Sequence, residues 1–312
     1  MYLESFTLPV KREEELIIKR MAKNAGLAPS YTWPEVVKYG YIDNEYPCGI
    51  FAPKGLDEIR FRKVTIFYGG NGSGKSTILN LIAAKLDLKR IAPFNSSELF
   101  DDYAEACQYT LGYDDEGSQY RIPDGSRIIT SDDIFDYMLA VRANNEDIKE
   151  ETEQGKAEYA RLKYGDTVKF NGLEDYDELR LQLLARQRTM TRRRFLRQTA
   201  GTQVKLSSNG ETALAYFEQK LQNDTLYCLD EPENSMSPRM QMELMKMLEE
   251  MARYCGCQFI IATHSPFLLS MEGARIYDLD ASPAEIRNWW ELENVKIYYD
   301  LFAGNRNLFE ED

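Results

Sequence analysis

The stretch "VTIFYGGNGSGKSTILNLI", residues 64–82, decides the fold. An apolar run typical of a buried strand is followed by a run with the periodicity of a helix. Between them stand Gly69, four further residues, and then Gly74-Lys75-Ser76. Glycines allow a backbone in which several N–H groups turn toward one point. The stretch therefore predicts a strand, a tight loop and a helix, in that order.

This spacing is the Walker A pattern in its strand–loop–helix context. Inward N–H groups and the positive end of the helix dipole attract phosphate oxygens. Lys75 is expected to reach the β- and γ-phosphates, and the Ser76 hydroxyl to ligate Mg²⁺. We therefore predict a nucleoside triphosphate site. Its predicted binding residues here are Gly69, Gly70, Asn71, Gly72, Ser73, Gly74, Lys75, Ser76 and Thr77.

A pair of acids follows a second apolar run, "TLYCLD", which is typical of a strand ending at Asp230. An acid at the carboxyl end of a strand faces the crevice where open α/β sheets bind ligands. Asp230 is therefore predicted to hold Mg²⁺ through water, as a Walker B acid. Glu231, the next residue, is placed to polarise the attacking water as a general base. The alternative is a polar turn ended by Pro232.

The rest of the chain alternates between the two periodicities. "CGIF", "EIRF" and "CQFIIAT" resemble strands, while 132–205 is mostly helical and polar. Strands alternating with helices indicate a parallel α/β sheet. We expect one domain over 1–312 with a helical insert, a lid subdomain, at 132–205. Six methionines between Met236 and Met251 are predicted to pack against the sheet.

Composition limits the function. The chain has 38 Lys and Arg against 51 Asp and Glu, a net charge of −13, which argues against a dedicated nucleic-acid coat. No apolar run approaches the roughly 18 to 20 residues that span a bilayer. The five cysteines are scattered, which favours reduced thiols. We expect a cytoplasmic protein with no membrane insertion.

Two further motifs point to a family. "KLSSNGETALAYF" places Ser208-Asn209-Gly210-Glu211 just before a predicted helix. It resembles the signature motif of ABC ATPases, Leu-Ser-Gly-Gly-Gln, at Ser208 and Gly210, and departs from it at Ser207, Asn209 and Glu211. The Ser-x-x-Glu spacing also fits a helix capping box. In "FIIATHSP", His264 is the only histidine of the chain and follows the strand after Asp230. ABC ATPases have there the H-loop histidine that contacts the γ-phosphate.

With four motifs in family order, the chain resembles the soluble bacterial "AAA family" ABC-type ATPases, relatives of SMC and DNA-repair ATPases. The resemblance implies a P-loop α/β fold with a mostly parallel central sheet, an antiparallel N-terminal β part and a helical insert. It also implies a head-to-tail homodimer with two ATPs, each bound with Mg²⁺, at the interface. Each ATP would touch Walker A of one chain and Ser208, Asn209, Gly210 and Glu211 of the other. The implied catalytic residues are Glu231, Lys75 and His264, and the implied metal ligands are Ser76 and Asp230.

Two family positions stay open. The Q-loop residue is either Gln108 or Asp132, and Asp132 also fits a helix cap. The aromatic residue that stacks on the base is either Tyr46 or Phe51, and both also fit core packing.

The segment from Arg180 to Arg197 holds seven arginines and no acid. A solvated helical face explains it, and so does docking to nucleic acid or to an acidic partner. Phosphate contacts made there would be sensitive to salt.

We predict an ATP-hydrolysing dimerisation switch that controls a partner protein, such as a defence or stress effector. The alternatives are a DNA-associated SMC- or repair-like ATPase, the ATPase subunit of an ABC transporter, and a slow-turnover nucleotide-sensing regulator. The insert lacks the long heptad runs of SMC arms, and the degenerate signature argues against a transporter.

Overall fold

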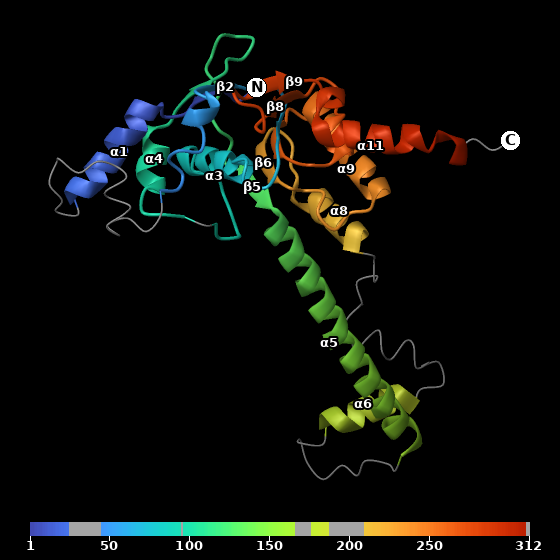
Figure 1. Cartoon of the computed structure of the whole chain (residues 1–312). Helices are drawn as coiled ribbons and strands as arrows, with labels where there is room; N and C mark the ends of the chain where they lie inside the picture. Colours follow the sequence, from blue (N-terminus) through green and yellow to red (C-terminus); the bar gives the residue numbers. More distant parts are fainter. Residues whose placement is uncertain (25–44, 95, 166–175, 187–208, 310–312) are drawn as a thin grey trace. The chain divides into compact units, whose positions relative to one another are not determined.

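The computed structural model describes residues 1–24, 45–94, 96–165, 176–186 and 209–309 (Figure 1). They form two compact units: Met1–Ile134 with Ala213–Asp312, and Phe135–Thr212. The predicted insert at 132–205 stays a prediction. None of the described helices is both long and apolar enough to cross a membrane.

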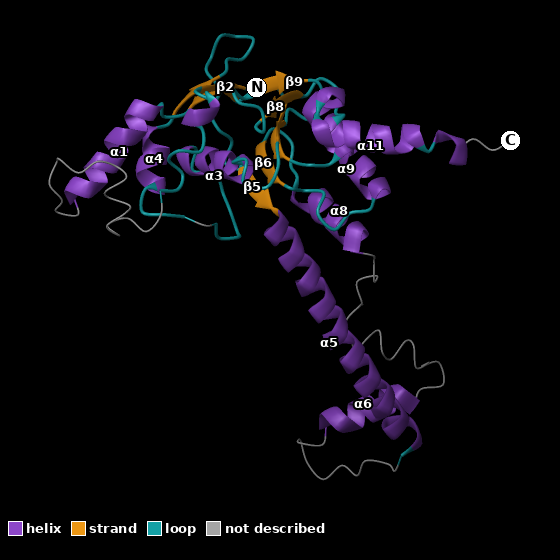
Figure 2. Ribbon diagram, in the orientation of Figure 1, coloured by secondary structure: helices purple, strands orange, loops and turns teal. Residues whose placement is uncertain are grey.

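The first unit contains a six-stranded sheet in the order β5-β6-β7-β3-β8-β9 (Figure 2). All neighbours are parallel except β8 and β9, so the predicted mostly parallel sheet is confirmed. Parallel strands bring their carboxyl ends to one edge, and the loops that follow β3, β6 and β7 therefore meet there. The strands are β3 (Val64–Tyr68), β5 (Arg127–Thr130), β6 (Leu226–Asp230), β7 (Gln258–Ala262), β8 (Arg275–Asp278) and β9 (Glu285–Arg287).

A separate three-stranded sheet has the order β2-β1-β4 and is antiparallel throughout. It consists of β1 (Leu3–Thr7), β2 (Glu58–Arg60) and β4 (Gln108–Leu111). The predicted antiparallel N-terminal part is thus confirmed.

The prediction of a strand over "CGIF" is wrong. Residues 48–51 form turns that lead into the 3₁₀ helix η1 (Ala52–Lys54). Pro47 has no N–H to donate to a ladder. Gly49 has φ +78°, a left-handed conformation that a strand does not use. Pro47 before the run and Gly49 within it therefore prevent a strand, although the run is apolar.

Helices cover the six-stranded sheet. The helix that follows the glycine loop, α3, is buried along most of its length and contacts β5, β6 and β7. The described helices of this unit are α1 (Lys11–Asn24), α3 (Lys75–Lys85), α4 (Phe100–Ala106), α8 (Asn209–Lys220), which begins in the second unit, α9 (Pro238–Tyr254), α10 (Pro266–Leu269) and α11 (Glu293–Gly304); the short η3 (Trp289–Glu291) and η4 (Arg306–Leu308) flank α11.

The prediction that the methionines pack against the sheet is confirmed only in part. Leu244, Leu248 and Ala252 form the buried stripe of α9 at a spacing of four residues. Met236 is buried, but Met242 is 42% exposed, and the other methionines of α9 are half-buried. The methionines flank the stripe that faces the core instead of forming it.

In the second unit the described residues form α5 (Ser131–Tyr164), which begins in the first unit, α6 (Tyr176–Arg186) and the start of α8. Tyr159 and Leu162 of α5 pack against Ala185 of α6. Arg186 donates from Nε to the Leu162 carbonyl at 3.1 Å, which ties the two helices together. Arg180 is exposed. The arginines at 188, 192, 193, 194 and 197 lie outside the described residues.

Candidate nucleotide site

The glycine loop follows β3 and ends at α3, as predicted. Lys75 is 5% exposed, and its Nζ donates to the Gly69 carbonyl at 2.7 Å and to the Gly70 carbonyl at 3.1 Å. Burial lowers the pKa of Lys75, and this outweighs the opposite effect of the nearby carboxylates Glu231 and Asp230. The ammonium group is thus held over the loop, where two backbone carbonyls and the nearby carboxylates offset part of the cost of its burial.

Gly74 shows why this loop needs glycine. Its φ is +102°, and a Cβ there would lie 2.8 Å from Phe51 Cε1 and 2.9 Å from Ile50 Cγ2. Phe51 is fully buried beneath the loop. A larger residue at position 74 would be strained and would also displace the side chains that support the loop.

Two charged side chains outside the motifs also hold the loop. Lys54 Nζ donates to the Ser73 carbonyl at 2.7 Å and to the Leu279 carbonyl at 2.6 Å. Asp280 Oδ2 accepts a hydrogen bond of 2.7 Å from the Gly70 N–H. The sequence analysis missed both, because neither lies in a recognisable local pattern.

The predicted metal ligands lie together. Ser76 lies in the first turn of α3. Its Oγ donates a hydrogen bond of 3.0 Å to Asp230 Oδ1, although 154 residues separate the two. Asp230 ends β6 and is paired in register with Thr130 of β5 and Ala262 of β7. A hydroxyl and a carboxylate on adjacent elements form the oxygen donor set that Mg²⁺ prefers.

The predicted base lies beside the predicted H-loop histidine. Glu231 has φ +47°, a left-handed conformation that is uncommon for a residue other than glycine. Its Oε1 lies 3.6 Å from His264 Nε2, and its Oε2 accepts a 3.1 Å hydrogen bond from Asn234 Nδ2. Burial and the nearby Lys75 lower the pKa of His264, and Glu231 opposes this in part. At neutral pH the imidazole is therefore uncharged.

The site leaves buried polar atoms without partners. Within the described part of the chain, Ser73 Oγ, Glu233 Oε2 and His264 Nε2 are buried and make no hydrogen bond. Two of these three atoms, Ser73 Oγ and His264 Nε2, belong to predicted phosphate-contacting residues. Unsatisfied buried polar groups are rare in native proteins and are explained when a ligand supplies the partner. The residues present fit a nucleoside triphosphate with Mg²⁺.

Replacing Asp230 by asparagine is expected to stabilise the metal-free protein. Burial is the main cause that raises the pKa of Asp230 from 3.8 to about 6; the Ser76 hydroxyl opposes it, and Glu231 adds to it. The folded protein thus holds this proton more tightly than the unfolded chain. Its contribution to stability is full below pH 3.8 and is lost as the pH rises through about 6.

At pH 8, without Mg²⁺, we therefore expect Asp230→Asn to raise the free energy of unfolding by about 1–3 kcal/mol. Near pH 4 the two proteins should differ little. Urea unfolding in a chelator at both pH values measures this. A variant less stable than wild type at pH 8 would contradict a buried, uncompensated carboxylate.

Other predicted residues are not brought into this arrangement. Ser208 lies outside the described residues, and Asn209, Gly210 and Glu211 begin α8 in the other unit. Gln108 is exposed in β4, in the antiparallel sheet. Their predicted roles stay predictions.

Asp132 lies at the start of α5 and is exposed. Its neighbour Asp133 makes the capping contacts, because its Oδ2 accepts from the Thr130 N–H at 2.7 Å and its Oδ1 from the Ala92 N–H at 2.9 Å. Capping therefore does not explain Asp132, and the Q-loop hypothesis for it stays open.

The two aromatic candidates both pack in the core. Phe51 is fully buried below Gly74. Tyr46 stacks on Phe100 with ring centroids 6.0 Å apart, and its hydroxyl bonds to Thr77 and Asn80. Phe51 is thus part of the core, Tyr46 lies half-buried against it, and a base-stacking role for either stays a prediction.

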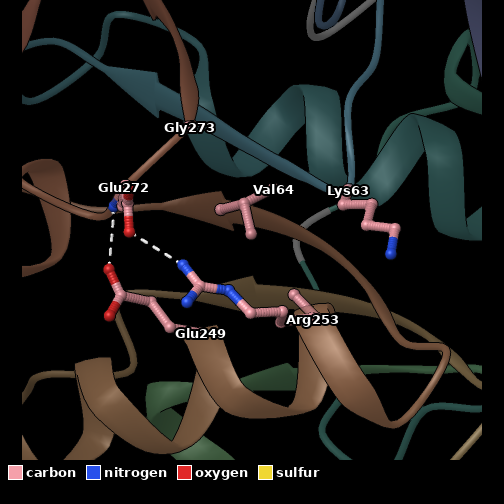
Figure 3. Close-up of a pocket in the computed structure, with 7 residues that line it drawn as sticks. Lys63, Val64, Glu249, Arg253, Glu272 and Gly273 are labelled. Carbon is pink, nitrogen blue, oxygen red and sulfur yellow. Dashed lines mark hydrogen bonds and ion pairs between the residues drawn. The ribbon is translucent and has the colours of Figure 1, made fainter.

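A shallow pocket lies at the opposite edge of the sheet, where β3 begins (Figure 3). Arg253 of α9 and Glu272 form an ion pair of 2.8 Å across it, and Glu249 accepts from the Glu272 N–H at 2.8 Å. These three charged groups are thus engaged with one another, and the strand ends that carry the motifs point away from the pocket.

Residues 208–270 match a protein family described as "AAA domain, putative AbiEii toxin, Type IV TA system". The match includes both acids after β6 and His264. A search of curated proteins gave no match.

Several solved structures are similar. An SMC head domain from Thermotoga maritima is 17% identical over 74% of this chain and 92% of that chain, with a TM-score of 0.34. A dimeric ATP-binding cassette in a post-hydrolysis state with ADP and Pi is 14% identical over 73% and 88%, with a TM-score of 0.35. An Smc head domain with an extended coiled coil, bound to the C-terminal domain of ScpA from Pyrococcus furiosus, is 14% identical over 78% and 94%, with a TM-score of 0.35. At such scores none of these similarities bears on function.

The parallel sheet, the glycine loop and the acid pair at one sheet edge are the features of a P-loop fold, and the family match over residues 208–270 agrees with that fold. The first unit thus has a P-loop fold, and residues 208–270 resemble an AAA domain.

Proposed function

We propose that the protein binds and hydrolyses ATP with Mg²⁺, and that ATP drives its dimerisation. The observation that carries this proposal is the convergence of Lys75, Ser76 and Asp230 with the Glu231–His264 pair at one sheet edge. Together these residues provide what phosphoryl transfer to water needs: a cation, metal ligands, a base and a phosphate contact.

The roles follow from the groups' positions. Lys75 is placed to bind the β- and γ-phosphates when its bonds to the loop carbonyls open. Ser76 and Asp230 would hold Mg²⁺, which neutralises charge on the phosphates when bound. Glu231 orients and deprotonates the attacking water, while Asn234 and His264 fix its carboxylate.

Dimerisation is proposed from the resemblance of residues 208–211 to the ABC signature motif, which in that family contacts the ATP bound by the other subunit. A segment of a second copy would supply that contact to the ATP of the first. Hydrolysis would remove the γ-phosphate that both copies hold and so open the dimer. The open and closed forms would present different surfaces to a partner protein, such as a defence or stress effector.

The test is the mass of Glu231→Gln measured by light scattering with and without ATP and Mg²⁺. We expect the mass to double with ATP, because the bound triphosphate is not consumed. Lys75→Ala, tested alongside, should stay monomeric under both conditions. Equal masses of Glu231→Gln with and without ATP would reject the dimerisation switch.

The same variant also tests the partner. Proteins or nucleic acid retained by ATP-bound Glu231→Gln, and not by Lys75→Ala, would distinguish a controlled effector from a DNA-associated ATPase. Retention of neither, with slow turnover in the wild type, would favour the nucleotide-sensing regulator.

A further inference from the structure

Glu233, in the turn after the acid pair, makes contacts that no motif assigns to it. It is 9% exposed. Its Oε1 accepts three hydrogen bonds, from Thr263 Oγ1 at 2.5 Å, from the His264 N–H at 2.9 Å and from the Ser265 N–H at 3.1 Å. One carboxylate oxygen thus binds every residue of the turn that follows β7.

These bonds join the two turns that carry the predicted base and the histidine. The strands themselves end with a backbone bond of 2.8 Å from Glu231 N–H to the Ala262 carbonyl. Beyond that point the Glu233 bonds connect the two turns directly, while the Thr263 N–H also bonds to the Phe67 carbonyl of β3 at 3.3 Å. The 3.6 Å approach of His264 Nε2 to Glu231 Oε1 lies between these two connections.

The histidine turn is itself well ordered by its neighbours. Thr263 Oγ1 accepts from the Ser265 N–H at 3.0 Å while donating to Glu233. Ser265 Oγ caps α10 and bonds to Gln241 Oε1 of α9 at 2.7 Å. The turn is therefore held by bonds within itself and to α9, and Glu233 links it to the turn that carries Glu231.

Stability alone does not explain a carboxylate at this position. A buried carboxylate has a large desolvation penalty, and replacing buried charge by well-packed apolar residues is often neutral or stabilising. Glu233 Oε2 is also buried and makes no hydrogen bond within the described residues. Burial raises the pKa of Glu233, although its hydrogen bonds oppose this. A penalty of this kind is typical of a group kept for function.

We propose that Glu233 is a positioning residue, which holds the His264 imidazole against Glu231 and so sets the efficiency of the base. The proposal rests on the proposed ATP hydrolysis. It predicts that Glu233 acts through His264 and not through ATP binding.

The kinetic test compares Glu233→Ala with Glu233→Gln. We expect Glu233→Ala to lower kcat about 10- to 50-fold with the Kd for ATP within about threefold, because a displaced group loses most of its effect. Glu233→Gln keeps an acceptor oxygen and should retain kcat within about threefold. Glu233→Ala combined with His264→Ala should be no slower than His264→Ala alone, within about twofold. The exposed Glu250→Gln is the control and should match wild type.

A second readout does not depend on turnover. Because His264 is the only histidine, the imidazole C–H signals in an NMR spectrum belong to it alone. Glu233→Ala should shift these signals and speed amide exchange at His264 and Ser265 about tenfold or more, while Glu233→Gln stays close to wild type. If Glu233→Ala does not fold, Thr263→Val removes one of the three donors and should shift the signals in the same direction.

Unchanged imidazole signals and amide exchange in both variants would overturn the proposal. Losses of kcat that multiply in the Glu233→Ala/His264→Ala protein would overturn it as well. A wild type without ATPase activity would instead reject the proposed function, and the NMR comparison would still decide whether Glu233 positions the imidazole.

Discussion

Replacing Glu231 by glutamine is expected to lower kcat for ATP hydrolysis by about 10²- to 10⁴-fold, the usual contribution of a general base. Glutamine has the same shape, so the Asn234 contact at 3.1 Å and the approach of His264 at 3.6 Å have a partner in the variant. Only the ability to take a proton from water is lost.

The Kd for ATP should stay within about threefold of wild type, since Lys75 and Ser76 are untouched. Single-turnover rates and equilibrium titrations with ATP measure the two quantities separately. Glu243→Gln is the matched control, because Glu243 is a carboxylate on the surface of α9 paired with Arg239. Turnover that survives in Glu231→Gln at the wild-type rate would show that another group activates the water.

Replacing Lys75 by methionine is expected to weaken ATP binding about 30-fold or more, since truncating one partner of a buried charge pair costs about 2–5 kcal/mol. Methionine fills the same space without the cation. In the protein without nucleotide, the carbonyls of Gly69 and Gly70 lose their Nζ contacts of 2.7 and 3.1 Å. The desolvation penalty of a buried ammonium is removed at the same time, so we expect little change in stability.

Lys85→Met is the control for this prediction. Lys85 lies at the far end of the same helix, where its Nζ bonds to the Glu105 carbonyl at 2.7 Å. It should bind ATP as wild type does. Calorimetric titration with ATP and Mg²⁺ gives both constants, and thermal unfolding confirms that the variants are folded. A Kd for Lys75→Met within threefold of wild type would contradict a phosphate site at this loop.

The sheet and the site could be predicted where the signal is local or follows from topology. The loop of residues 69–76 has a fixed spacing, and parallel strands place their carboxyl ends together. This rule predicts that Ser76 and Asp230 lie close together although 154 residues separate them, and no local sequence pattern is needed for that prediction.

The remaining features depend on contacts that have no local signature. Lys54 reaches the Leu279 carbonyl across 225 residues, and Asp280 reaches the Gly70 N–H across 210. Neither residue type nor spacing distinguishes them from ordinary surface charges. The methionines of α9 share the helical period with the Leu244 stripe, so periodicity alone does not say which side meets the core.

The placement of Phe51 below Gly74 has a consequence for any attempt to isolate a minimal catalytic fragment. A shortened protein beginning at Val64 would keep every motif from Gly69 to His264. It would nevertheless lose the Phe51 ring that packs against Gly74 of the loop. Removing a buried aromatic side chain leaves a large cavity, which is one of the most destabilising changes a core can undergo. In this chain, a fragment can therefore contain all the sequence motifs and still fail to bind a triphosphate. The residues before Val64 supply the packing that the binding loop needs.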